Sequence, residues 1–496
     1  MPSLSRGGIF FHRNEVHTMQ SSLSSIRVQQ NVRWLPADMD TPISLFLGMV
    51  RDRHGILLES AEVDGRWGRY SLLACDMALY LTCRDGRLSC TVKDERFAPL
   101  SELDGLPFVE GLREAMRRIH ILPDPQAESL PPITRSLCGY LGFEMAGLFE
   151  PELAAAMPPE QAECVLCLPG TMMLFDHLYN RLAQVSLGEP SPVLGAHSSA
   201  VAGESLCRMD ADRVDAPRGG EVYQEIVRLI KQKASEGEVI QAVPSVRFST
   251  PFEGDPLALY RRMRSENASP YMFFMRLPGI TLFGSSPEVM VQCTGGRLLS
   301  SPIGGTRRRG RSVAEDEALA AELLQDPKER AEHMMLVDLG RNDLGRIARP
   351  GTVEVERLML VERFSHVMHL TSRVTAQLRE GLEAVDVLAA VFPAGTVSGA
   401  PKIRAMELLT GMEQEPRGPY GGCIGWLGLD KAAVHLDTGI TIRSMWVREG
   451  RLNWQAGSVI AHDADPSKEW KEVCNKSAIM RQVCSDSGVQ YVPAHR

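Results

Sequence analysis

The sequence has no long apolar run, no excess of positive charge and no regular cysteine framework. No stretch reaches the roughly 18 apolar residues that a membrane-spanning helix needs, so we expect no membrane span. The first 30 residues lack the apolar segment of a secretory signal. A net charge of -8 argues against a general nucleic-acid-binding protein. The 11 cysteines are odd in number and scattered, which favours a reducing compartment, and we expect a cytoplasmic protein.

A zinc site and a nucleic-acid surface are also not favoured. Cys164 and Cys167 form a lone CxxC inside an apolar run, which is typical of strand residues rather than of a metal site. The one basic cluster, Arg307 to Arg311, is short and lies between glycines. It fits a loop over an anionic small molecule, or a solvated loop, better than a DNA-binding surface.

The 496 residues are enough for two or three domains. Residues 31–190 alternate short apolar runs with turns, and Asp85-Gly86 between two such runs predicts a β-hairpin. Residues 191–219 are rich in Pro, Gly and Ser and predict a linker. Mixed helix and strand patterns follow over residues 220–490. We expect residues 1–30 to be a leader, within which Met19 is an alternative start.

Two pairs of glutamates are the main candidates for metal binding. Glu329 and Glu332 are three residues apart on a stretch with helical composition, and Glu469 and Glu472 repeat this spacing. Four carboxylates in two such pairs suit a hard divalent cation, and Mg2+ is the natural candidate. The alternative is two solvated helix faces, because exposed carboxylates at this spacing are common.

Ten short segments, taken together and in order, resemble the chorismate-utilising enzymes, and most closely the large subunit, component I, of anthranilate synthase. The match is dense over residues 220–485 and thin over residues 40–185. The segments are Leu57-Leu58-Glu59-Ser60, Ser269–Phe273, Ser286-Pro287-Glu288, Pro302–Arg307, Asp326–Arg346, His366–His369, Pro393–Lys402, Tyr420-Gly421-Gly422, Ile442-Arg443 and Glu472–Lys476.

The resemblance implies an α+β fold, an α/β sandwich with antiparallel sheets inside, helices outside and a site between the two halves. It places the chorismate-binding catalytic domain in residues 220–490 and a tryptophan-site segment in residues 31–190. The implied activity converts chorismate and ammonia to anthranilate and pyruvate through 2-amino-2-deoxyisochorismate, the first step of tryptophan biosynthesis.

The resemblance also assigns roles to single residues. Glu332 and Glu472 would hold Mg2+ against the ring carboxylate, with Glu329 and Glu469 acting through water. Glu288 would be the general acid for the departing ring hydroxyl, Gln241 would orient ammonia, and His369 would serve the elimination of pyruvate. Without the resemblance, we would interpret Glu288 as an exposed turn residue, Gln241 as a polar strand residue and His369 as a structural histidine.

Tyr420 and Arg443 would hold the enolpyruvyl carboxylate, because a planar guanidinium fits a carboxylate with two hydrogen bonds. The remaining implied substrate-binding residues are Gly305, Thr306, Thr396, Gly457, Ser458 and Val459. Feedback inhibition by tryptophan would use Ser60, Pro270, Tyr271 and Met272, which could otherwise be plain hairpin and core residues.

Three classes of function remain open. The first is anthranilate synthase component I. The second is another chorismate enzyme: one that stops at 2-amino-2-deoxyisochorismate, an aminodeoxychorismate synthase, or an isochorismate or salicylate synthase. Gln241 and Gly304 argue against the last two groups, whose members carry lysines at one or other of these positions. The third is a non-catalytic subunit that binds tryptophan or chorismate, supported by Pro244 and Val459, which depart from the pattern.

The sequence contains no Gly-x-Cys-x-Gly nucleophile turn of the kind that hydrolyses glutamine. Glutamine-dependent activity would therefore need a separate amidotransferase small subunit, and a heterotetramer is expected.

Overall fold

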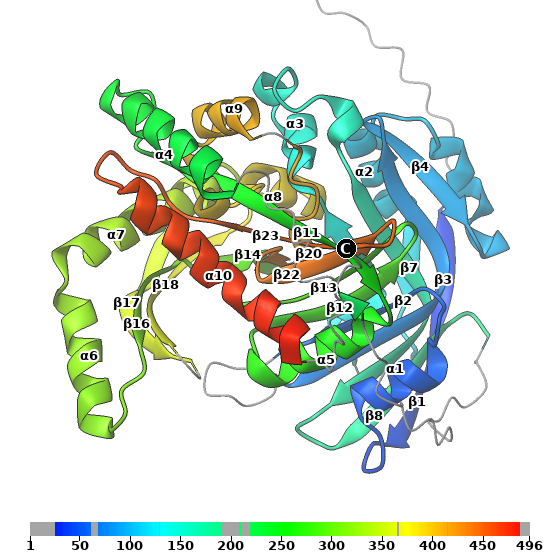
Figure 1. The fold of residues 1–496 in the computed structure, drawn as a ribbon. Helices are drawn as coiled ribbons and strands as arrows, with labels where there is room; N and C mark the ends of the chain where they lie inside the picture. Colours follow the sequence, from blue (N-terminus) through cyan, green and yellow to red (C-terminus); the bar gives the residue numbers. More distant parts are fainter. Residues whose placement is uncertain are drawn as a thin grey trace, which may run out of the picture.

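The computed structural model describes residues 25–60, 68–127, 129–189, 208–209, 219–364, 367–413 and 415–486. Over these residues, two large sheets pack face to face and helices cover their outer sides (Figure 1). The predicted α+β sandwich with antiparallel sheets inside and helices outside is confirmed. The parallel pair between β1 and β5 is the exception to the antiparallel pairing.

The two sheets share the long strands β3 and β7. Along β3 the register shifts between Met77 and Leu79, a bulge that lets a long strand bend from one sheet into the other. The first sheet runs in the order β1 (Ile26–Pro36), β8 (Arg181–Leu187), β7 (Cys164–Asp176), β3 (Tyr70–Arg84), β2 (Gly55–Glu59), β12 (Tyr271–Leu277), β13 (Ile280–Ser286), β22 (Ser444–Arg448), β23 (Arg451–Gly457), β11 (Ser245–Glu253) and β9 (Arg208–Met209).

The second sheet begins on the other half of β3 and β7 and carries most of the remaining strands. Both β15 and β16 pair with one edge of β18, and β17 pairs with the other. The order is β4 (Arg87–Val92), β3, β7, β6 (Ser136–Leu141), β20 (Cys423–Gly428), β21 (His435–Ile440), β14 (Val289–Thr294), β15 (Arg297–Ser300), β18 (Val367–Gln377), with β16 (Ile303–Arg308) and β17 (Glu354–Arg363) beside β18. Strand β5 (Ile119–Leu122) pairs with β1, and β10 (Gln241–Ala242) pairs separately with β19 (Gly399–Ala400).

Helices cover both outer faces, and each face has its own apolar cluster. The first sheet packs against α1 (Pro42–Met49), α4 (Gly219–Ser235), α5 (Pro256–Glu266), α9 (Lys402–Met412) and α10 (Pro466–Asp486). The second packs against α2 (Phe108–Arg118), α3 (Ala146–Phe149), α7 (Pro327–Gly345) and α8 (Ala384–Val391), and α6 (Val313–Gln325) lies over β16 and β18. In Figure 1, α4 and α10 lie side by side, and α6 and α7 flank the end of the second sheet.

A third apolar cluster fills the space between the sheets. It includes Tyr140 of β6, Phe273 of β12 and Ile424 of β20, all less than 3% exposed. Because β2 pairs with β12 and β6 pairs with β20, residues 31–190 and 220–490 contribute strands to both sheets. The sheets therefore join the two sequence regions.

Several local predictions are confirmed. The Asp85-Gly86 hairpin joins β3 and β4, and both residues have the positive φ that such a turn needs. Cys164 and Cys167 are buried residues of β7, as predicted. Strand β1 begins at Ile26, inside the stretch assigned to a leader, and most of the linker and residues 1–24 lie outside the described residues.

The strand-like pattern of residues 239–248 is interrupted at Pro244. Pro244 separates β10 from β11, and the pairing partner changes there from β19 to β23. Proline has no amide hydrogen to donate to a sheet, so the ladder cannot continue through this position.

Candidate active site

Two connections between the sheets run side by side at the centre of the molecule. Pro287 and Glu288 link β13 of the first sheet to β14 of the second, and residues 441–443 link β21 back to β22. The amide of Ile440 donates to the Glu288 carbonyl at 3.0 Å, and the amide of Ser285 donates to the Arg443 carbonyl at 3.1 Å. Residues about 155 positions apart are thus held together at the junction of the sheets.

The carboxyl group of Glu288 is suited to proton donation near neutral pH. Burial raises its pKa to about 7, and the nearby Thr396 hydroxyl and Lys476 ammonium offset part of that shift. Lys476 lies on α10, where it donates to the Gly457 carbonyl at 3.1 Å and pairs with Glu472 at 2.7 Å. A carboxyl with a pKa near 7 can both hold and release a proton under physiological conditions.

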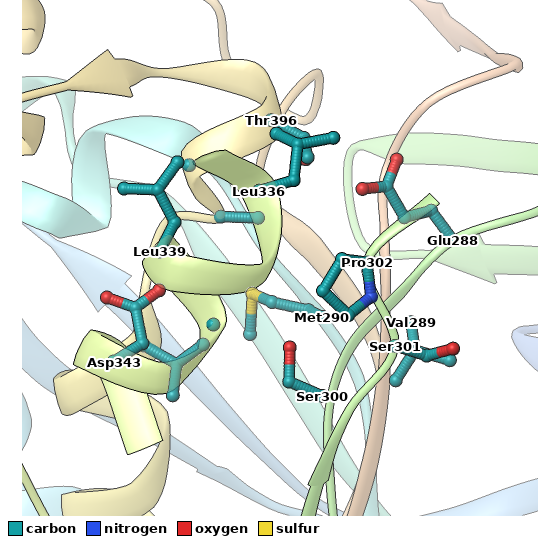
Figure 2. A pocket seen from close by; sticks show the side chains of 14 residues that line it. Glu288, Val289, Met290, Ser300, Ser301, Pro302, Leu336, Leu339, Asp343 and Thr396 are labelled. Atoms are coloured by element: carbon teal, nitrogen blue, oxygen red, sulfur yellow. The ribbon is translucent and has the colours of Figure 1, made fainter. Parts of the chain in front are cut away.

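A small cavity reaches the Glu288 carboxyl. Its volume is about 30 Å3, enough for one or two water molecules and too small for a substituted ring acid. Figure 2 shows Glu288 and Thr396 at one end and Asp343 at the other, with Leu336 and Leu339 of α7 along the wall. The cavity can therefore hold water beside the acid.

His369 on β18 is held in one tautomer. Its Nδ1 lies 3.0 Å from the Gly305 carbonyl oxygen and 3.1 Å from the Thr306 hydroxyl. Because a carbonyl can only accept, Nδ1 carries the hydrogen and Nε2 keeps a free lone pair. Burial and the nearby Arg443 guanidinium lower the pKa of His369, so the ring is neutral and basic at pH 7.

Gly305 sits in a bulge of β16 and has a φ of +59°. Glycine adopts this conformation without strain, and the bulge turns its carbonyl toward His369. The Gly304-Gly305-Thr306 segment is thereby shaped to hold the imidazole.

Arg443 is partly buried and forms no ion pair within the described residues. Burial lowers the pKa of its guanidinium, while the Tyr420 hydroxyl and the Glu472 carboxylate are close enough to raise it. Burial also raises the pKa of Tyr420 to about 12, so its phenol stays protonated and can donate. A guanidinium and a phenol donor together can accept a carboxylate.

Other buried polar atoms around these residues also have no partner among the described residues. They include the side-chain nitrogen of Gln241 and the hydroxyl of Thr441. Gln241 on β10 is 1% exposed and faces Ala400 across the β10–β19 pair. Buried polar atoms normally have partners, so these two indicate a site that a polar ligand completes.

The two acidic pairs lie on α7 and α10. Lys328 of α7 interacts electrostatically with acids of both helices, because Glu332 of α7 and Glu469 of α10 both raise the pKa of Lys328. Burial and the like charges of Glu329 and Asp463 raise the pKa of Glu332. Each predicted metal-binding acid pairs with a lysine of its own helix, Lys328 with Glu332 at 3.5 Å and Lys476 with Glu472 at 2.7 Å.

Glu332 and Glu472 are half-exposed carboxylates on two different helices. Such donors suit Mg2+, which commonly takes one or two protein carboxylates and completes its shell with water and substrate. No group of three or more His, Cys, Asp or Glu side chains able to hold a metal occurs in the described part of the chain.

The basic cluster at 307–311 does not form a loop over a ligand. Arg307 lies on β16 and pairs with Glu322, Asp326 and Glu329 at 2.8–3.0 Å. Arg309 pairs with Asp316 at 2.8 Å. The cluster ties β16 to α6 and α7, and it occupies one oxygen of Glu329.

The end of β23 brings backbone atoms, more than side chains, to the candidate site. Gly457 pairs with Ser245, and a Cβ at Gly457 would lie 2.4 Å from the Pro244 carbonyl oxygen, so glycine is required there. The Ser458 hydroxyl contacts the Tyr223 hydroxyl of α4 at 2.7 Å and so points toward that helix. Val459 is 39% exposed beyond the end of the strand.

The two segments expected to bind the inhibitor lie next to each other, because Glu59 faces Met272 across the β2–β12 pair. Ser60 follows the end of β2, and Pro270 precedes β12. The Glu59 carboxylate is already bound by Arg264 at 2.9 Å and by the Tyr260 hydroxyl at 2.6 Å. Ser60, Pro270, Tyr271 and Met272 remain around this junction.

Sequence reasoning did not select Lys476 as a site residue. In sequence it reads as the partner of Glu472 one helical turn away, which is typical of a solvated helix face. Only its contact with the Gly457 carbonyl and its closeness to Glu288 place it in the site.

Among the described residues, no helix has both the length and the apolar composition needed to cross a bilayer.

Comparison with known proteins agrees with this geometry. A family model described as "chorismate binding enzyme" matches residues 96–482. Anthranilate synthase component 1 of Pseudomonas aeruginosa is 37% identical over 90% of this chain and 93% of its own length. The Aquifex aeolicus protein of the same name is 36% identical over 93% and 97%.

Solved structures give the same picture. Anthranilate synthase component I from Streptococcus pneumoniae is 31% identical, with a TM-score of 0.66, over 84% of this chain and 92% of that one. The menaquinone-specific isochorismate synthase MenF from Escherichia coli is 16% identical, with a TM-score of 0.69, over 93% and 95%, and it supports the fold alone. The resemblance inferred from the ten sequence segments is confirmed.

Proposed function

Because the chain belongs to the family of chorismate-binding enzymes, we propose that it is component I of an anthranilate synthase, which converts chorismate and ammonia to anthranilate and pyruvate. The observation that carries the proposal is the partly buried Arg443 without an ion pair in the described residues, beside the Tyr420 phenol and the crossover that bears Glu288. The pair would bind the enolpyruvyl carboxylate and leave the ring facing Glu288 and His369.

In the first step, ammonia attacks the ring and its lone pair forms the new carbon–nitrogen bond. The ring double bonds shift, the ring hydroxyl leaves, and protonated Glu288 donates the proton that makes it water. The orphaned amide of Gln241 would position ammonia, which needs no base because it is already a nucleophile when unprotonated. The new ammonium group then loses one proton, which replaces the proton that Glu288 gave to the leaving hydroxyl, and the product of this step is 2-amino-2-deoxyisochorismate.

In the second step, Nε2 of His369 removes the hydrogen from the ring carbon that bears the amine. The electrons of that bond complete the aromatic ring as the enolpyruvyl carbon–oxygen bond breaks, and protonation of the departing enolpyruvate gives pyruvate. The Gly305 carbonyl keeps the hydrogen on Nδ1, so that Nε2 is the basic nitrogen.

Mg2+ is part of the proposal, held by Glu332 and Glu472. When bound, it would supply the positive charge that the ring carboxylate needs. Its support is that Glu469 of α10 lies close enough to Lys328 of α7 to raise the pKa of that lysine, so the acidic pairs of the two helices lie near one another.

The surroundings of Gly304 favour this reaction over aminodeoxychorismate synthesis through a lysine at that position. A Cβ at Gly304 would lie 3.0 Å from Leu336 Cδ1 and 3.2 Å from His333 Nδ1. A longer side chain would have to displace a helix side chain. Gly457, Thr306 and Thr396 would complete the substrate contacts.

Ammonia would come from a separate glutamine amidotransferase subunit, in a heterotetramer. With ammonium salts the isolated chain should work alone. The cytoplasmic location stays a prediction.

Feedback inhibition by tryptophan is also proposed, with Tyr271 as its link to the site. Tyr271 pairs with Ser286 across the β12–β13 pair, and Ser286 lies two residues before Glu288 in the sequence. Its ring covers Gly439, where a Cβ would lie 2.6 Å from the Tyr271 Cγ atom, and its hydroxyl donates to Asp437 at 2.6 Å. An inhibitor that moved Tyr271 would thus act on the strands that carry Glu288 and Arg443.

The test is to incubate the purified protein with chorismate, Mg2+ and ammonium chloride while following anthranilate fluorescence and pyruvate. The expected result is equal amounts of both products, with a much weaker reaction for Arg443→Ala. An amino product without pyruvate would favour the enzyme that stops at 2-amino-2-deoxyisochorismate. Binding of chorismate or tryptophan without turnover would favour the non-catalytic subunit and overturn the proposal.

A further inference from the structure

The structure assigns a positioning role to Arg417, a buried arginine that holds three separate active-site segments in register. The inference rests on the proposed function for its kinetic consequence and on contacts in the protein for its geometry. Arg417 is 1% exposed and lies in the loop between α9 and β20, three residues before Tyr420.

The guanidinium uses its donors on groups from different parts of the chain. It binds Glu413 with two hydrogen bonds, from Nε at 2.8 Å and from Nη2 at 2.7 Å. Nη1 donates to the Val397 carbonyl at 2.6 Å, and Nη2 donates to the Val243 carbonyl at 2.7 Å. A planar group with fixed donor directions sets the distances among all three partners.

The two backbone partners each lie within two residues of a residue of the proposed site. Val397 follows Thr396, and Val243 is two residues after Gln241. The guanidinium carbon also lies 6.0 Å from the ring centre of Tyr420. The Arg417 side chain thus connects the segments that carry Gln241, which is proposed to orient ammonia, the Thr396 hydroxyl and the Tyr420 phenol.

The network extends to a fourth segment through Glu413. Its Oε1 accepts from the Ser245 amide at 2.8 Å, and the Ser245 hydroxyl accepts from the Gln455 amide at 2.8 Å. Ser245 faces Gly457 in the β11–β23 pair. The strand end that brings its backbone to the site is therefore braced by the same ion pair.

The backbone at Arg417 is fixed as well. The amides of Arg417 and Gly418 donate to the two oxygens of the Glu144 carboxylate at 2.5 and 3.0 Å. The Arg417 side chain also packs against the Phe143 ring at 4.3 Å. Because Glu144 and Phe143 belong to the N-terminal region, the brace joins that region to the site.

Arg417 is not placed to touch substrate, because the residue is 1% exposed and four of its five N–H donors bind protein groups. Its role is to set where Gln241, Thr396 and Tyr420 lie relative to one another. Arg417→Lys keeps the charge and removes the fork, so it should misplace these groups without leaving Glu413 unpaired.

The kinetic test compares Arg417→Lys with the wild type at a temperature well below the unfolding transition. We expect kcat/KM for chorismate with ammonium to fall on the order of 10- to 100-fold, with changes in both kcat and KM. Arg135→Lys is the matched control, because Arg135 binds Asp430 with the same two-pronged geometry away from the site. It should keep wild-type kinetics.

Loss of one partner of a buried ion pair can unfold a protein, so a second variant removes both charges. Glu413→Gln combined with Arg417→Met leaves no unpaired charge and should show the same kinetic loss. Wild-type values of kcat and KM in either folded variant would overturn the proposal, since a purely stabilising pair would change only the melting temperature.

Amide hydrogen exchange tests the geometry independently of the reaction. In Arg417→Lys, segments 241–245, 394–398 and 418–422 should all lose protection, while strands β3 and β7 should not change. In the wild type the three segments should open with a common free energy. Unrelated opening in the wild type, or a change confined to 418–422, would overturn the proposal. If the wild type makes no anthranilate, the proposed function fails and exchange still decides the role of Arg417.

Discussion

The pKa of Glu288 gives the reaction a definite dependence on pH. Glu288 must carry a proton to act, so kcat/KM should fall above about pH 7, where the carboxyl ionises. His369 must be unprotonated, and its pKa is lowered from 6.5, so activity should fall on the acid side only below that value. The measurement is kcat/KM for chorismate against pH at a constant concentration of free ammonia.

Glu288→Gln should lower kcat about 10²- to 10⁴-fold and remove the alkaline fall. Asp343→Asn is the control, because Asp343 lines the far end of the cavity and pairs with Lys402 at 2.8 Å. The Asp343→Asn variant should be less stable than the wild type and should keep the alkaline fall in kcat/KM. A Glu288→Gln enzyme with the wild-type profile would show that another group is the acid.

A change at His369 should separate the two steps. His369→Gln removes the basic Nε2, so we expect 2-amino-2-deoxyisochorismate to accumulate while pyruvate release falls about 10²- to 10⁴-fold. Chromatography of the products and a coupled pyruvate assay check this. Thr306→Val should not make 2-amino-2-deoxyisochorismate accumulate, since the Gly305 carbonyl still fixes the tautomer of His369. Unchanged pyruvate release would refute the role of His369.

Residue spacing alone pointed to the two glutamate pairs, whereas Glu288, His369 and Arg443 were proposed only because of the family resemblance. The sequence could not find Arg417 or Lys476, because their roles depend on which carbonyls lie within reach after folding. The sequence also cannot show that the Ser458 hydroxyl points to α4 or that Arg307 is fully paired.

At the scale of elements, the contact between Tyr271 and Gly439 makes a sharp prediction. Gly439→Ala places a methyl group 2.6–2.9 Å from the Tyr271 ring, whose hydroxyl is fixed by Asp437. We expect a loss of about 1–3 kcal/mol in the free energy of unfolding from overpacking, and weaker inhibition by tryptophan. Denaturant unfolding and tryptophan inhibition curves measure the two effects.

Gly411→Ala is the matched control, because its new methyl group meets no atom within 4 Å. It should leave inhibition close to wild type and keep or slightly raise the stability, since alanine is more favourable than glycine in a helix. Full tryptophan sensitivity in a stable Gly439→Ala protein would contradict the proposed link.

Element prediction succeeded where local signals dominate. The Asp85-Gly86 hairpin and the helical stretch that carries Glu329 and Glu332 are both present. Local patterns did not show that the strand partner changes from β19 to β23 at Pro244, or that the Asp326 carboxylate caps α7 and separates it from α6. No sequence pattern gave the pairing of β2 with β12 or of β6 with β20, because strand pairing joins distant residues.

At the scale of the whole molecule, the shared sheets predict that neither region is stable alone. A fragment of residues 219–486 would lose β2 from beside β12 and β6 from beside β20, and it would expose the apolar cluster between the sheets. We expect no cooperative thermal transition in its near-ultraviolet circular dichroism. Adding a fragment of residues 25–189 should restore the transition, whereas a sharp transition without it would contradict the prediction.

The pairing of β6 with β20 also has a consequence for how the chain is made. Ser136 and its partner Gly428 are about 290 residues apart. At roughly 5–20 residues per second, the ribosome needs on the order of 15–60 s to deliver the second strand after the first. During that interval the nascent β6 edge lacks its native neighbour, and the β2 edge lacks its own until β12 has been made, so aggregation during expression should depend on chaperone supply and on elongation rate across residues 140–430.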